Sequence, residues 1–217
     1  MVGNERARVS LRDKSRADKE ARIRAAAQAL WKERGFEATT TREVAERAGI
    51  ATGTLFLYVR SKDELADFVF RGEIERVVEE RWASLPKRAD LVTRLMHLFG
   101  GLLELYARDL DVARILVRHV LLARPGDDST QLTFAFLNRL SELVGEAEAA
   151  GQIVVATGEQ TALALHAFTL YVGGVLALVN GVMPLEMAAA MVRRALEVHF
   201  SGLRGNANPK TRTRRGT

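Results

Sequence analysis

Prolines occupy only four of the 217 positions, and none precedes Pro86. Because a proline inside a helix removes a hydrogen bond and clashes with the preceding turn, this spacing leaves long stretches free to be helical. In the first stretch, apolar residues recur at helical intervals of three and four, at Ile23, Ala26, Ala27, Leu30 and Trp31. Gly35 then stands where such a helix would end. These features predict a helical chain.

The rest of the chain also divides into helical segments, which glycine and proline turn signals separate. We expect helices over 41–48, about 52–58 and from 61 onward, and then near 89–108, 110–123, 128–151, 158–180 and 185–202. Alternation typical of a strand is lacking, since 152–156 is too short to count. The predicted fold is all-α, with about nine helices.

Two of these helix starts carry capping residues. Thr41 stands at the expected N-cap of the 41–48 helix, and Gly49 follows its last residue. Ser61 precedes the next long helix with Glu64 three residues later, which is the spacing of a capping box. Both starts are therefore predicted to be fixed locally.

The composition excludes several kinds of site. The chain has no cysteine, so disulfides, thiolate zinc sites, iron–sulfur clusters and cysteine nucleophiles are ruled out. The N-terminus has no apolar run like that of a secretory signal, which predicts a cytoplasmic protein. Residues 1–65 carry a net charge of +4, residues 66–203 of −4 and residues 204–217 of +5. This distribution indicates that one part of the chain meets a polyanion and another part does not.

One uncharged stretch, residues 161–185, is long enough to cross a bilayer. Its polar residues and glycines dilute its hydrophobicity, and it lacks the flanking Lys/Arg asymmetry that fixes membrane topology. A helix that is apolar on all sides also suits a protein core or a subunit interface. We favour the buried helix and no membrane, with a membrane span as the alternative.

Residues 41–58 have the layout of a helix-turn-helix. One short helix runs into Gly49, which tolerates the positive φ of a sharp turn, and a second short helix follows at once. The apolar inner side consists of Val44, Ala45, Ala48, Ile50 and Leu55, and the uncharged outer face consists of Thr52, Thr54, Leu57 and Tyr58. Such a face fits a DNA major groove. The same spacing also suits an αα-corner in an ordinary helical bundle.

The continuous run from Ile23 to Leu65, with Gly35 and Gly49 in place, resembles the DNA-binding domain of the TetR (tetracycline repressor) family. The resemblance implies a nine-helix protein whose first three helices bind DNA. Later helices would form a ligand sensor, and the last two would pair with a second subunit. The corresponding domains are a basic, disordered arm over 1–15, a helix-turn-helix domain over 16–65, a ligand-binding and dimerisation domain over 66–203, and a basic, disordered tail over 204–217.

The resemblance also implies roles for individual residues. The matched phosphate contacts are Thr40, Thr41, Tyr58 and Lys62, and the matched groove-facing residues are Thr52 and Thr54. Arg42 matches a position that in some members reaches a guanine, to which a guanidinium can bond bidentately. Each position also has a purely structural explanation, such as capping, solvation or core packing.

Three positions depart from the family pattern. Tyrosine and histidine are usual where this chain has Phe56 and Leu57. Phe56 has no hydrogen-bond donor in its side chain and is expected to pack inside the domain, whereas Leu57 is able to contact a thymine methyl group. Ala51 replaces the usual serine, which lowers local stability by about 0.5–2 kcal/mol unless Thr52 caps the helix instead.

The sensor half is expected to surround a cavity for a small apolar or amphipathic effector. The candidate lining residues are Met96, His97, Leu103, Tyr106, His119, Phe134, Phe136, Leu137, His166 and Tyr171, with plain core packing as the alternative for each. The candidate homodimer interface consists of Gly173, Gly174, Met187, Ala188, Met191, Val192, Ala195, Leu196 and Phe200 on the last two helices. A homodimer would read a palindromic operator, because one short helix contacts too few base pairs.

We therefore expect a ligand-released transcriptional repressor that needs no cofactor. An all-α carrier or enzyme and a non-specific, nucleoid-type DNA binder are the alternatives. The sequence lacks a serine nucleophile elbow, an HExxH helix, a P-loop and paired carboxylates on one helix face, so we predict no enzyme. The four histidines show no i, i+4 pairing and no acidic partner at metal-binding spacing, which predicts no metal site.

Overall fold

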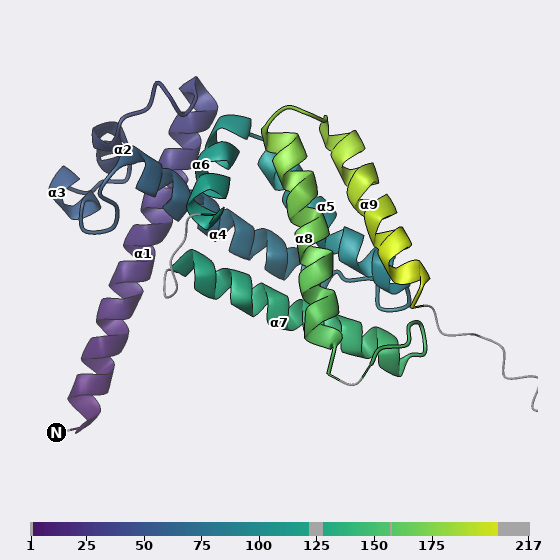
Figure 1. Ribbon diagram of the computed structural model, residues 1–217. Coiled ribbons are helices and arrows are strands. Elements are labelled where there is room, and N and C mark those ends of the chain that lie inside the picture. The colour runs from purple at the N-terminus through teal and green to yellow at the C-terminus, as the bar shows by residue number, and fades with distance from the viewer. Residues whose placement is uncertain (1, 122–127, 157, 204–217) are drawn as a thin grey trace, which may run out of the picture. The chain divides into compact units, whose positions relative to one another are not determined.

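The protein is described from a computed structural model, which covers residues 2–121, 128–156 and 158–203, with side chains for 14–118, 130–156 and 158–203. Within these ranges the chain forms nine helices, and its only extended pairing is an isolated bridge at Ile153 (Figure 1). The helices are α1 (Val2–Arg34), α2 (Thr41–Arg47), α3 (Thr52–Leu55), α4 (Lys62–Ala83), α5 (Leu91–Ala107), α6 (Leu110–Leu121), α7 (Asp128–Ala149), α8 (Gln160–Val179) and α9 (Leu185–Ser201). The all-α prediction is confirmed.

The ends of the chain differ from the sequence prediction where they are described. Helix α1 extends back to Val2, so the backbone of residues 2–15 is helical rather than a disordered arm. The predicted boundary after residue 65 falls inside α4, which is continuous. The basic tail over 204–217 lies outside the described residues.

The chain separates into two compact units. The N-terminal unit contains Met1–Arg76 and Asp109–Leu122, so it holds α1 to α3, most of α4 and α6. Its core joins α1, α2, α3 and α4 through small and branched side chains: Ile23, Ala26, Ala27, Leu30, Val44, Ala45, Ala48, Leu55, Val59, Leu65 and Val69. The apolar faces predicted for the first helix and for the helix-turn-helix are therefore buried together.

The C-terminal unit contains Val77–Arg108 and Ala123–Thr217. Helix α8 packs against α5, α7 and α9, and α5 also packs against α7 and α9. Aromatic rings from α5, α7 and α8 meet at the centre of this unit. Phe99 stacks on Tyr171 with ring centres 4.6 Å apart, and Phe136 packs edge to face with Phe99 at 6.3 Å. Burial raises the pKa of Tyr171 well above its ordinary value.

Helix α8 is the segment of the described chain that is long and apolar enough to cross a membrane, and 44% of its apolar window is buried inside the protein. Its contacts with α5, α7 and α9 account for that burial. One such helix is weak evidence for a membrane span, because core helices of soluble proteins share the same length and composition. The packing favours a core helix.

Candidate nucleic-acid interface

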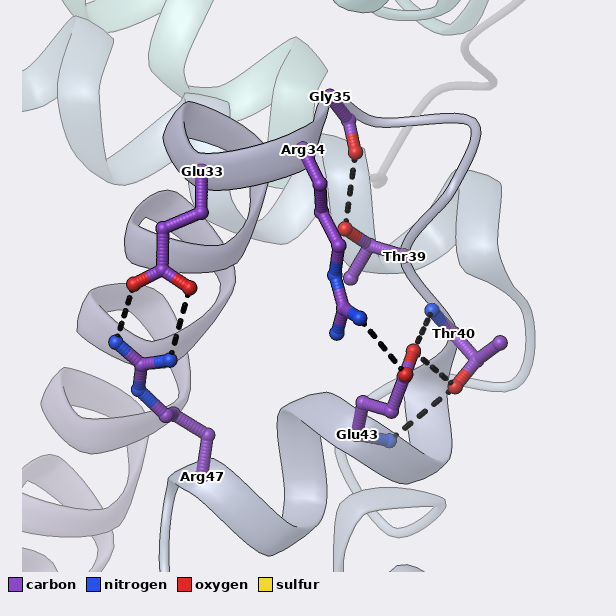
Figure 2. A network of polar contacts seen from close by, with 7 residues as sticks. All are labelled: Glu33, Arg34, Gly35, Thr39, Thr40, Glu43 and Arg47. Atoms are coloured by element: carbon purple, nitrogen blue, oxygen red, sulfur yellow. Dashed lines mark hydrogen bonds and ion pairs between the residues drawn. The ribbon is translucent and has the colours of Figure 1, made fainter.

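The start of α2 is fixed by a complete capping box (Figure 2). The hydroxyl of Thr40 accepts a hydrogen bond from the Glu43 backbone N–H at 3.3 Å, and the Glu43 carboxylate accepts from the Thr40 N–H at 2.9 Å and from its hydroxyl at 2.7 Å. The N-cap is therefore Thr40, and the prediction of Thr41 was wrong by one residue. Because the Thr40 hydroxyl is engaged in the cap, it is not free to hold a phosphate in this structure.

Arginine side chains extend this cap into a network that joins α1 to α2. Arg34 lies 3.0 Å from the second oxygen of Glu43. The hydrogen bonds from Thr40 contribute most to lowering the pKa of Glu43, and the charge of Arg34 adds to them. At the other end of α2, Arg47 pairs with Glu33 of α1 through two hydrogen bonds of 3.0 and 2.5 Å (Figure 2). This pairing lowers the pKa of Glu33.

The turn between α2 and α3 depends on Gly49, whose φ of +64° is the left-handed conformation predicted for it. The Gly49 N–H donates to the carbonyl of Glu46 at 3.0 Å, and the Ile50 N–H donates to the carbonyl of Ala45 at 3.0 Å. These two bonds close the end of α2 in a Schellman-like pattern. The second helix consequently starts immediately after the turn.

Helix α3 is shorter than predicted. It ends at Leu55, and residues 56–58 form a turn in which the Tyr58 N–H donates to the carbonyl of Leu55 at 2.9 Å. Its N-cap is Ala51, which makes no side-chain capping bond. Thr52 is the first helical residue and does not replace the missing cap. With a single turn and no cap, α3 depends on the buried Leu55 for its position.

The predicted groove-facing residues are accessible from solvent. Leu57 is 83% exposed, and Thr52 and Thr54 are partly exposed. The prediction that Phe56 packs inside the domain was wrong, because the turn after Leu55 leaves the Phe56 side chain 46% exposed. An uncharged segment thus follows the turn, and it has the exposure that direct contact with base edges requires.

One aromatic and one cationic side chain, those of Tyr58 and Lys62, flank this segment. Tyr58 is half-buried, with its ring 6.5 Å from that of Phe68 on α4. The ammonium group of Lys62 donates to the backbone carbonyl of Glu37 at 2.8 Å and lies 4.4 Å from the ring centre of Phe36. An ammonium has three donors, so this bond to the chain still leaves donors for a phosphate.

The start of α4 differs in one detail from the predicted capping box. The hydroxyl of Ser61 accepts from the Glu64 N–H at 3.0 Å, as expected of the N-cap. The Glu64 carboxylate, however, accepts from the Arg60 N–H at 2.6 Å, one residue before the cap.

Arg42 on α2 is exposed and forms no ion pair with any residue whose side chain is described. Its guanidinium is therefore available to a partner.

The sequence did not reveal the residues that hold this surface rigid. Glu33 and Arg47 lie 14 positions apart, and Lys62 and Glu37 lie 25 apart, so no local spacing rule connects either pair. The hydroxyl of the buried Thr39 donates to the carbonyl of Gly35 at 2.9 Å, which fixes the loop before α2. Of the two capping signals, the i, i+3 relation of Ser61 and Glu64 was recognised from the sequence, whereas that of Thr40 and Glu43 was not.

The predicted effector-lining residues fall into two groups in the C-terminal unit. Met96, Leu103, Tyr106, Phe136 and Tyr171 are buried, Leu137 is partly buried, and Phe134 and His166 are exposed. The ring of His97 lies 3.0 Å from the hydroxyl of Ser84. The side chain of His119 lies outside the described residues. The exposed positions of Phe134 and His166 contradict a role inside an apolar cavity.

The predicted interface residues also divide between two faces. Ala188, Val192, Leu196 and Phe200 are buried within the protomer, as is Gly174, so they are not available to a second subunit. Burial at every fourth residue shows that this stripe of α9 faces its own core. Met187 and Gly173 are exposed, and Met191 and Ala195 are partly exposed.

No group of three or more histidine or acidic side chains able to hold a metal ion occurs in the part of the chain that the structure describes.

Comparison with known proteins places this surface in a family. Residues 23–68 match the sequence model described as bacterial regulatory proteins, tetR family. The HTH-type transcriptional repressor KstR2 of Mycobacterium tuberculosis H37Rv is 36% identical over 78 residues, which cover 36% of this chain and 39% of KstR2. The regulator YfiR of Bacillus subtilis is 37% identical over 72 residues, 33% of each chain. The chain thus matches about two fifths or less of the length of these relatives.

Solved structures extend the similarity to most of the chain. FadR from Bacillus subtilis, in complex with stearoyl-CoA, is 19% identical with a TM-score of 0.60, covering 84% of this chain and 98% of that one. Thermus thermophilus FadR, a repressor in complex with lauroyl-CoA, is 22% identical with a TM-score of 0.61, covering 91% and 100%. At these identities the likeness concerns the fold. The family match therefore concerns residues 23–68, which are similar to the bacterial regulatory proteins of the tetR family, and the chain as a whole is similar to these solved structures in fold.

Proposed function

We propose that the protein is a sequence-specific DNA-binding transcriptional regulator that acts as a repressor in the cytoplasm. The observation that carries this proposal is the exposed, uncharged segment after Gly49, which is positioned by the Gly49 turn and the buried Leu55 and flanked by Lys62 and Arg42. The uncharged side chains would meet base edges in the major groove, Arg42 would reach a guanine, and Lys62 would meet a phosphate. The relatives, which are transcriptional regulators by name, support a binding role rather than an enzymatic one.

A second copy of the chain would complete the DNA-reading unit. A single turn of α3 spans too few base pairs for useful specificity, whereas two copies would read half-sites about 34–36 Å apart. The outward face of α8 and α9 carries exposed apolar residues, with Leu165 48%, Met187 57% and Val198 56% exposed. Apolar surface of this kind is typical of subunit interfaces. We assign the homodimer contact to this face.

The effector would be a small apolar or amphipathic molecule bound by the C-terminal unit. The aromatic and aliphatic interior between α5, α7 and α8 supports this chemistry. The two FadR proteins of similar fold were solved with long-chain acyl-CoA thioesters, which makes these thioesters the first compounds to test. Binding would then release DNA through a coupling of about 1–3 kcal/mol.

Selection of bound sites from a random pool of double-stranded DNA tests the proposal. We expect enrichment of an inverted repeat whose half-sites are one helical turn apart. Binding that depends strongly on salt but shows no preference over scrambled DNA would instead identify a nucleoid-type binder. Failure to bind any DNA would overturn the proposal.

The dimer and the effector are tested separately. Light scattering of the purified protein is expected to give the mass of two chains, and a monomer at micromolar concentration would refute the dimer. Lauroyl-CoA and stearoyl-CoA, titrated against the complex with the selected operator, are expected to release the DNA. Release by free coenzyme A at the same concentrations would show that the acyl chain is not what the protein recognises.

A further inference from the structure

Two histidines that are far apart in the sequence meet on neighbouring helices of the C-terminal unit. His166 lies on α8 and His199 on α9, with ring centres 5.3 Å apart and planes inclined at 82°. The other two histidines lie elsewhere: His97 is on α5 beside Ser84, and His119 is on α6. The pair is therefore a specific product of how α8 and α9 pack.

The packing that brings the histidines together is set by Gly174. Helices α8 and α9 lie side by side and run in opposite directions (Figure 1). A Cβ atom on Gly174 would lie 2.3 Å from a methyl carbon of Val192, so the helices approach closely there because no side chain intervenes. At 1.5 Å per residue, His166 stands about 12 Å before Gly174 and His199 about 10 Å beyond Val192. The two rings consequently face each other at the same level of the antiparallel pair.

The spacing of the rings matches that of two imidazoles on one metal ion. Metal–nitrogen bonds of about 2.0–2.1 Å and a tetrahedral angle place two coordinated ring centres roughly 5 Å apart. The observed 5.3 Å is close to that value. The His166 side chain is exposed, so it has room to turn toward the ring of His199.

The state of His199 also suits metal binding. Its Nε2 atom is buried and has no hydrogen-bond partner among the described residues, although buried polar atoms are nearly always paired. An ion at this position would supply the missing partner.

We infer that His166 and His199 form a two-histidine chelate that binds one borderline transition-metal dication, such as Zn²⁺, Ni²⁺ or Cu²⁺, across α8 and α9. Imidazole nitrogens favour these ions over Mg²⁺ and Ca²⁺, which prefer oxygen ligands. The chain has no cysteine, so no thiolate competes for the ion. The protein supplies two ligands, and water would fill the remaining coordination positions. The bound ion would tie α8 to α9 and stabilise the C-terminal unit.

Calorimetric titration of the metal-free, full-length protein with zinc, nickel and copper chlorides tests this inference. We expect one ion per chain, no binding of magnesium chloride, and a rise in the melting temperature on adding zinc. Exchanging His166 for Ala or His199 for Gln should weaken binding by at least about tenfold. The matched control is His97→Ala, which removes a histidine outside the pair and should leave the affinity unchanged.

Electron paramagnetic resonance of the copper-loaded protein gives an independent readout. Coupling of the copper spin to two nitrogens is expected in the wild type and to fewer in His166→Ala. Binding that survives the double exchange of His166 and His199, or equal binding of magnesium, would overturn the inference. Because the test uses no DNA, its result is separate from that of the proposed regulatory function.

Discussion

Each of the two units is stabilised internally by a different kind of contact. The N-terminal unit fixes short helices with polar devices: the Thr40–Glu43 capping box, the Arg47–Glu33 pair and the bond from Lys62 to the Glu37 carbonyl. The C-terminal unit packs long helices through rings and branched side chains, as in the stack of Phe99 on Tyr171. The first arrangement presents a defined polar surface, whereas the second provides an interior. This contrast matches the proposed division between reading DNA and sensing an effector.

The two tryptophans make this contrast measurable. Trp31 lies in the N-terminal unit, where its ring meets that of Phe36 at 5.4 Å. Trp82 lies in the C-terminal unit beneath the guanidinium of Arg139, at 4.2 Å from the ring centre. The variants Trp82→Phe and Trp31→Phe each leave one fluorescent reporter. Unfolding of each unit is then observable separately.

The largest effect is expected from Phe99→Ala, which removes the ring at the centre of the C-terminal unit. Loss of a fully buried phenylalanine lowers the free energy of unfolding by about 3–5 kcal/mol. Urea unfolding followed by Trp82 should show this loss, and Trp31 should show less of it. Phe134→Ala is the control, because that ring is 61% exposed. Equal losses in both variants would contradict the assigned core.

The next largest loss of stability is expected from Gly174→Ala. The new methyl group would meet Val192 at 2.3 Å, and such overpacking costs about 1–3 kcal/mol. Gly173→Ala is a matched control one residue away, because nothing lies within 4 Å of a Cβ atom there. Thermal unfolding of the two variants should differ clearly. If they melt together, the close approach of α8 and α9 at Gly174 is incorrect.

In the N-terminal unit, Gly49→Ala should lower stability by roughly 1–2 kcal/mol, since an alanine at positive φ is strained. No atom obstructs the methyl group, whose nearest neighbour would be 3.7 Å away, so strain is the only cost. Trp31 fluorescence in urea reports the change. Gly53→Ala, in open space and without a positive φ, is expected to be neutral or stabilising.

Lys62→Ala is expected to act on DNA binding more than on folding. Loss of one phosphate contact should weaken binding to specific and scrambled DNA alike and reduce the slope of log affinity against log salt by about 1. Fluorescence anisotropy with labelled operator measures both quantities. The exposed Lys87 of the C-terminal unit is the control. An unchanged salt slope would show that Lys62 contacts no phosphate and only stabilises the fold through Glu37 and Phe36.

The smallest effect concerns acid stability. Because the folded-state pKa of Glu43 lies below its ordinary value of 4.5, its ionised carboxylate stabilises the fold above that value. The contribution is lost as the pH falls through the lowered pKa, that is, below about pH 4.5. Glu43→Gln should therefore melt earlier at neutral pH and differ less from wild type in acid. Glu46→Gln, one turn later, should not change the pH profile.

Sequence prediction also succeeded differently in the two units. Signals that act over three or four residues, such as Gly49 after α2 and the spacing of Ser61 and Glu64, located the helices and turns of the N-terminal unit. The position of Phe56 was not predictable, because it depends on where α3 ends. The C-terminal helices were located by periodicity and turn residues. Their facing sides were not, since burial of Val192 and Phe200 depends on contacts with α5 and α8.

The same limit explains why the sequence did not predict that His166 and His199 lie side by side. His166 and His199 show no helical spacing relative to each other, and only the crossing at Gly174 brings them together. Sequence spacing identifies metal ligands on one helix, but it does not identify ligands shared between two. The prediction of no metal rested on spacing alone.

The carboxylate of Glu43 has a consequence for how the protein searches DNA. It accepts hydrogen bonds from the backbone N–H and the hydroxyl of Thr40, the N-cap of α2, and places a negative charge beside that residue (Figure 2). A phosphate approaching this point meets repulsion before it meets a hydrogen-bond donor. If the protein binds DNA as proposed, arbitrary sequences, which offer only their phosphates, would be held more weakly for this reason. A matching operator that also contacted Leu57 would compensate for the repulsion, so Glu43 would shorten the time that the protein spends at non-operator sites.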